Sequence, residues 1–174
     1  EIRFKSNTVS VANLLPGILY QKIGEEFPKI ENLPVMSLPA QLIQSDPSLK
    51  YIPCHRLSGK LYSLSIGEHV LSISCPRPYS GWKEGFRDII VRLTKLLEQT
   101  KLVETVERFS IRYINIIPKS QGNISLDKLK INLQVGDHNL LNKTTYLRTE
   151  IAEGDFLNII QVSAPTAATM QDGA

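Results

Sequence analysis

The feature that most constrains this chain is a long stretch of helical periodicity, from about Gly81 to Lys101. Apolar residues recur there at steps of three and four, which places them on one face of an α-helix, while charged residues fill the opposite face. Ser80 stands where an N-cap is expected. The predicted apolar face contains Trp82, Phe86, Ile89, Ile90, Leu93, Leu96 and Leu97. A helix this amphipathic requires an apolar surface to cover.

Strands are predicted to supply that surface. Between Leu61 and Cys75, apolar residues alternate with serines on both sides of Gly67, which predicts a β-hairpin with one apolar and one hydroxyl-rich face. A later strand, ended by Pro118, is predicted to bury Phe109, Ile111 and Tyr113 and to expose Arg108, Ser110 and Arg112. The remaining predicted strands are 129–135, 144–152 and 156–164, the last two paired around the turn 153–155.

The N-terminal part has weaker patterns. Pro16 to Phe27 is predicted to form a short helix that Pro28 ends. The proline-rich stretch from Pro28 to Pro53 is predicted to be irregular and partly extended, because proline fixes φ and removes a backbone donor.

These elements predict an α+β fold. A mainly antiparallel sheet is packed by one long amphipathic helix and preceded by the irregular proline-rich segment. The sheet could be mixed where the hairpin, the helix and the following strand form a crossover. We expect one domain over residues 1–164 and a small, polar, mobile tail over 165–174.

Composition narrows the protein class. The chain has 174 residues, of which 42% are hydrophobic and 21% charged, as in ordinary globular domains. No apolar run reaches the length that crosses a bilayer, so no membrane association is predicted. Cys54 and Cys75 cannot form a disulfide framework, which favours free thiols in the cytoplasm. The net charge of +3 is dispersed along the chain, whereas nucleic-acid modules cluster their basic residues.

No catalytic residue, metal site or cofactor is predicted. Cys54 and His55 are adjacent, but neighbouring side chains point in opposite directions on an extended chain, whereas an activated cysteine needs a base within reach. The histidines and cysteines lack the spacing of metal ligands. Gly81 and Gly85 open a helix without the Lys-Ser of a phosphate-binding loop.

Four residues are candidates for binding. Tyr79 and Trp82 lie at a strand-to-helix junction, where aromatic residues either bind a ligand or lock the helix onto the sheet. Arg112 and Asn115 lie on a predicted strand. The structural alternative is that Arg112 pairs with a carboxylate such as Glu150 and that Asn115 caps a loop.

Several segments resemble an uncharacterised protein family that is scattered among bacteria and archaea. The likeness rests on the amphipathic helix and on Glu1-Ile-Arg-Phe4, Leu15-Pro-Gly-Ile-Leu-Tyr20, Glu26-Phe-Pro28, Tyr79-Ser-Gly-Trp82 and Ile111-Arg-Tyr-Ile-Asn-Ile-Ile117. It implies that a further strand and helix follow Ala174. Because the chain opens without Met inside a predicted strand, we also expect residues before Glu1. The family has no established activity, and its sporadic distribution suggests accessory or defence-associated genes.

The leading hypothesis is a non-catalytic protein-binding or assembly module of an accessory, defence-associated prokaryotic system. Its partner would be another protein or, in a homodimer, a second copy of this chain. Many short strands offer edges that pair with other chains. The alternative is a nucleic-acid-associated accessory protein, since basic residues lie on or beside strands: Arg56, Lys60, Arg108, Arg112, Lys128 and Lys130. A third hypothesis is an enzyme whose site includes parts beyond Ala174.

Overall fold

The computed structural model describes residues 1–6, 8, 10–76, 78–79, 81–116, 134–139 and 144–164. The chain divides into two compact units, Glu1–Tyr113 and Ile114–Ala174, and each is described by itself. The single domain over 1–164 stays a prediction. The predicted tail 165–174 lies outside the described residues.

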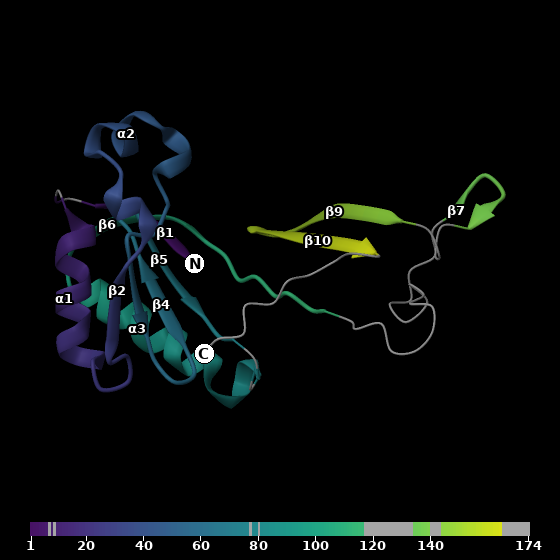
Figure 1. Ribbon diagram of the computed structural model, residues 1–174. Helices are drawn as coiled ribbons and strands as arrows, with labels where there is room; N and C mark the ends of the chain where they lie inside the picture. The colour runs from purple at the N-terminus through teal and green to yellow at the C-terminus, as the bar shows by residue number, and fades with distance from the viewer. Residues whose placement is uncertain are drawn as a thin grey trace. The chain divides into compact units, whose positions relative to one another are not determined.

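The first unit is built on a six-stranded sheet with the order β2-β3-β4-β5-β1-β6 (Figure 1). Its strands are β1 Ile2–Ser6, β2 Lys29–Asn32, β3 His55–Ser58, β4 Ser63–Ile66, β5 Val70–Ser74 and β6 Val103–Phe109. All neighbouring strands in it are antiparallel, and the predicted hairpin is confirmed as β4 and β5. Since β1 is antiparallel to both neighbours, β5 and β6 run parallel to each other with β1 between them.

Helices cover one face of this sheet. They are α1 Val11–Ile23 and α3 Arg87–Gln99, and a separate lobe holds α2 Ala40–Ser45 with the 3-10 turns η1 Pro34–Ser37 and η2 Pro47–Leu49. Figure 1 shows α3 running behind the strands. Side chains from both long helices form one core with the strands: Phe4, Leu15, Leu19, Leu57, Leu64, Ile66, Leu71, Ile89, Leu93 and Leu97 are its central members. The predicted α+β class, with a mostly antiparallel sheet and one main helix, is confirmed.

Strand alternation leaves a polar face on the other side, which we call the open face. By register it carries Arg3, Lys29, Glu31, Arg56, Ser58, Ser63, Ser65, Ser72, Ser74 and Arg108. The hydroxyl-rich side of the hairpin is therefore where the sequence predicted it, and the Oγ atoms of Ser63 and Ser74 lie 2.8 Å apart.

The main helix begins differently from the prediction. Residues Trp82–Phe86 form a π-helical turn, η3, and regular α-helix starts only at Arg87. Gly81 and Gly85 have φ of 107° and 132°, a region that favours glycine, and these two kinks break the first turn. The predicted N-cap, Ser80, lies outside the described residues.

The first helix also differs. It begins at Val11 rather than Pro16, and Pro16 lies inside it. The predicted irregular stretch 28–53 contains β2 and three short helical turns, so that prediction was wrong in part. Proline limits these elements to three to six residues without preventing them.

The predicted strand up to Pro118 is corrected as well. Pairing with β1 ends β6 at Phe109, and residues 110–116 form no strand. Phe109, Ile111 and Tyr113 are 63%, 54% and 56% exposed instead of buried. The last backbone hydrogen bonds between this segment and β1 join Ser110 to Glu1, the first residue of the given sequence.

The second unit contains hairpins. Strands β9 Thr145–Glu153 and β10 Phe156–Ala164 pair along their whole length, which confirms the predicted last pair. Strands β7 Gln134–Val135 and β8 His138–Asn139 pair around Gly136 and Asp137. Most of the predicted strand 129–135 lies outside the described residues.

Candidate functional site

On both sides of β1, the neighbouring segments extend past Glu1, the first residue of the given sequence. Strand β4 pairs with β5 along Leu71 to Ser74, but β1 pairs with β5 only at Val70 and Leu71. Residues 72–74 therefore have a ladder neighbour on one side only among the described residues. On the far side of β1, residues 110–113 continue beyond the end of β6. We call the place between 72–74 and 110–113, in line with β1, the open ladder position.

Backbone groups on both sides are oriented toward this position. Phe4 N–H donates to His69 C=O at 3.0 Å, so His69 faces β1, and alternation makes Leu71 and Ile73 face the same way. Across β1, Ser110 N–H donates to Glu1 C=O at 2.8 Å and the Glu1 nitrogen donates to Ser110 C=O at 2.9 Å. Continued in extended conformation, the next residue facing that side is Arg112.

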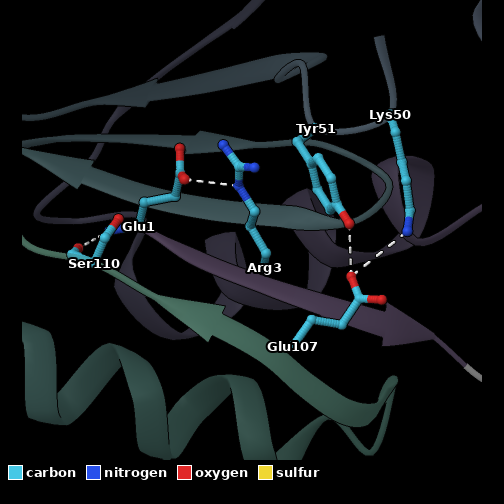
Figure 2. A network of polar contacts seen from close by, with 6 residues as sticks. All are labelled: Glu1, Arg3, Lys50, Tyr51, Glu107 and Ser110. Carbon is cyan, nitrogen blue, oxygen red and sulfur yellow. Dashed lines mark hydrogen bonds and ion pairs between the residues drawn. The ribbon is translucent and has the colours of Figure 1, made fainter. Parts of the chain in front are cut away.

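A network of polar contacts lies at the beginning of β1 (Figure 2). Arg3 donates from Nε to Glu1 Oε1 at 2.8 Å, and its guanidinium lies 4.4 Å from the centre of the Tyr51 ring. Tyr51 donates its hydroxyl proton to Glu107 Oε2 at 2.8 Å. That hydrogen bond lowers the pKa of Glu107, and the nearby Lys50 ammonium lowers it further. These contacts fix the beginning of β1 against β6.

Aromatic side chains gather on the helix side of the sheet at the open ladder position. The Tyr79 ring meets Phe86 and Tyr113 edge to face, with centroids 5.7 and 6.0 Å apart, and Trp82 meets Phe86 at 6.2 Å. Desolvation beside these rings, together with a hydrogen bond to Tyr113, raises the pKa of Tyr79 to about 12. Ile73 and Trp82 are half-buried against the core, whereas Tyr79 is 41% exposed.

Three of the four sequence candidates therefore belong to the first unit. Tyr79 and Trp82 both pack on Phe86, and Arg112 is exposed beside Tyr113. Asn115 is exposed and belongs to the second unit, so it is not placed with the others. Sequence reasoning missed Ile73, because it is one of several alternating residues and only the strand order distinguishes it.

The other candidates from the sequence fall elsewhere. Cys54 is buried, and burial, followed by the charge of Glu68, raises the pKa of its thiol, which opposes the thiolate that a nucleophile requires. His55 Nδ1 lies 3.0 Å from Asn32 Oδ1. Within the described ranges, no group of three or more His, Cys, Asp or Glu residues could hold a metal ion.

Two arginines on the open face have acidic neighbours. Arg56 lies 3.6 Å from Glu31, and Arg3 is bound to Glu1. Lys128 and Lys130 lie outside the described residues. The open face is thus of mixed charge, unlike the basic stripe of a nucleic-acid surface.

No described helix has the length and apolar character needed to cross a bilayer. Comparison of the chain with protein-family models, curated proteins and solved structures finds no match.

Proposed function

We propose that this protein is a non-catalytic protein-binding module that recognises another polypeptide through its sheet. The observation that carries the proposal is the exposed segment at the end of β6, in which the apolar residues Phe109, Ile111 and Tyr113 alternate with polar ones. Extended polypeptides commonly bind along such strand segments.

The outer edges of the sheet are less suited to strand addition. Strand β6 departs from regular register with β1 between Arg3 and Phe4 and again between Lys5 and Ser6. Such bulges disrupt the regular spacing that a new strand would need. Strand β2 has only four residues, and Lys29 and Glu31 on it are charged. Both features are common protections of sheet edges.

The apolar side chains of this segment are widely exposed. Phe109, Ile111 and Tyr113 alternate with polar residues, and more than half of each is exposed. Exposed apolar residues that lie together mark interaction sites, whereas single ones need no explanation. A bound polypeptide would cover these side chains.

The cellular setting extends this proposal. We place the protein in the cytoplasm, since its two cysteines are thiols rather than a disulfide. The family resemblance supports a role in an accessory, defence-associated prokaryotic system. The bound polypeptide can also belong to a second copy of this chain, in which case the protein is a homodimer.

Backbone protection tests the proposal. The probe is an acetylated, amidated octapeptide of alternating valine and threonine, and the readout is amide hydrogen exchange with and without the peptide. We expect slower exchange at Ile111, Arg112 and Tyr113. Exchange slowed at β2 alone, or nowhere, would refute binding at this segment.

A pair of variants at one residue separates backbone from side chain. Arg112→Pro removes a backbone amide donor in the middle of the exposed segment, and Arg112→Ala keeps it. No strand includes Arg112, so neither change removes a described ladder hydrogen bond. We expect the proline variant to bind the octapeptide at least about tenfold more weakly than the alanine variant, from the lost hydrogen bond and the altered backbone. Equal affinities would contradict the proposal.

A further inference from the structure

The chain between β2 and β3 forms a lobe of its own, residues 33–53. The lobe holds α2 and the turns η1 and η2, and it stands at one end of the sheet (Figure 1). We infer that the lobe unfolds locally, as one piece, while the sheet and the two long helices stay folded, and that the hydrogen bond from Tyr51 to Glu107 is the latch that keeps it in place. This inference goes beyond the proposed function and does not depend on it.

The backbone hydrogen bonds of the lobe are local. At its root, Leu33 N–H donates to Cys54 C=O at 2.8 Å, which continues the pairing of β2 with β3. Further N–H groups donate to carbonyls three or four residues earlier inside the lobe, and they belong to Met36, Leu38, Leu42, Ile43, Asp46, Leu49, Lys50 and Ile52. Segments whose hydrogen bonds are mostly their own can unfold without disrupting the rest of a protein.

The apolar contacts of the lobe are few. Its side chains Val35 and Ile43 pack with Ala12 and Cys54 in a small cluster, separate from the main core of the sheet and the long helices. Because so few side chains are buried there, the cluster contributes little against the conformational entropy that the lobe regains on unfolding.

Polar contacts at the end of the lobe join it to the sheet (Figure 2). Tyr51 donates its hydroxyl proton to Glu107 Oε2 at 2.8 Å, and Lys50 Nζ lies 3.6 Å from the same oxygen. The guanidinium of Arg3 lies 4.4 Å from the centre of the Tyr51 ring. Glu107 belongs to β6 and Arg3 to β1, so these contacts hold the lobe at strands far from its root.

The lobe covers part of the open face. Val70 pairs with Arg3 and therefore lies on that face, yet it is fully buried. The last part of the lobe passes close by, because a Cβ atom at Gly67 would lie 2.5 Å from the Ile52 carbonyl oxygen and 2.9 Å from Val70 Cγ1. Unfolding of the lobe would thus expose Val70 on a face that is otherwise polar, and Cys54 in the small cluster.

Chemical modification of Cys54 tests the inference. Iodoacetamide is added to the protein at a fixed pH, and mass spectrometry of peptides follows Cys54 separately from Cys75. Since Cys54 packs against the lobe, its rate of modification reports how often the lobe unfolds. We expect slow modification of Cys54 below the urea concentration that unfolds the sheet. A Cys54 thiol that stays unmodified until the whole unit unfolds would overturn the inference.

Two variants separate local from global unfolding. Tyr51→Phe removes the hydroxyl of the latch and keeps the ring on which Arg3 lies, so it should speed the modification of Cys54 by at least about threefold. Tyr20→Phe is its matched control, because Tyr20 is an exposed tyrosine outside the lobe. Leu93→Ala weakens the main core, which stays folded when only the lobe unfolds, and should leave the rate unchanged.

The opposite results would overturn the inference. If Leu93→Ala speeded the modification of Cys54 by about thirtyfold or more, as a lost core contact speeds global unfolding, the lobe would not unfold by itself. If Cys54 reacted at the same rate in Tyr51→Phe and Tyr20→Phe, the Tyr51 hydroxyl would not be the latch. Binding of the alternating octapeptide is a separate measurement, so failure of either proposal leaves the other in place.

Discussion

Glu68 caps the helix that begins at Val11: its Oε1 accepts hydrogen bonds from the backbone N–H of Val11 at 3.0 Å and of Ser10 at 2.8 Å. The other carboxylate oxygen accepts from Ala12 at 3.0 Å. Glu68 lies in the turn between β4 and β5, far from α1 in sequence. The carboxylate therefore accepts hydrogen bonds from three backbone N–H groups at the start of the helix, which have no partner within the helix itself. Its negative charge also suits the positive end of the helix dipole.

Replacing Glu68 tests this cap. Glu68→Ala should lower the free energy of unfolding by about 0.5–2 kcal/mol, as the loss of an N-cap does. Glu25→Ala is the matched control, because Glu25 is an exposed residue beyond the other end of α1. Chemical denaturation measures both. A Glu68 variant as stable as the Glu25 variant would show that the cap contributes nothing.

Leu93 tests the packing of α3. The side chain is 3% exposed inside the core, so Leu93→Ala should cost about 2–5 kcal/mol of unfolding free energy. Val91 on the same helix is 42% exposed, and Val91→Ala should cost less than about 1 kcal/mol. Urea titration of the two variants compares them. A cost below about 1 kcal/mol at Leu93 would contradict the buried position.

The two thiols should react at different rates. Burial and the Glu68 charge raise the pKa of Cys54, which is 8% exposed, whereas Cys75 is half-buried. At neutral pH a thiol reagent should modify Cys75 first and Cys54 only on unfolding. Mass spectrometry of timed samples reports the order, and Cys54→Ser identifies each signal. Failure of both to react under denaturing, non-reducing conditions would contradict free thiols.

Alkaline pH should weaken the fold through Tyr79. Its pKa is raised from 10.0 to about 12 in the folded protein, so folding favours the neutral phenol. That contribution is complete below pH 10 and is lost as the pH rises from about 10 to about 12. Tyr79→Phe should flatten the decline of unfolding free energy over this range. If the unfolding free energy of Tyr79→Phe declined as steeply as that of the wild type, Tyr79 would not be the cause of the decline.

Much of the fold could be predicted because periodic patterns reflect burial. The steps of three and four that place Ile89, Leu93 and Leu97 in the core were readable directly. The start of α1 was not, because its cap comes from Glu68, more than fifty residues away. Strand β3 was missed since its four residues include one fully buried side chain, Leu57, and so give no alternation to detect.

The candidate site was predictable only in part. Tyr79, Trp82 and Arg112 stood out as residue types in unusual places, but the strand predicted to continue through 109–113 ends at Phe109. Its burial was wrong, because burial depends on a ladder partner that only the strand order reveals. No local pattern places Leu71 and Phe109 on either side of Ile2.

The insertion of β1 between β5 and β6 also fixes an order of events during synthesis. Ile2 pairs with Leu71 and Phe109, so β1 is made before either of its neighbours exists. Until β6 emerges, β1 can only dock on β5 by one edge, and these sequence-distant contacts form slowly because long loops must close first. The nascent chain therefore displays an unfinished sheet for as long as the ribosome needs to translate α3 and β6.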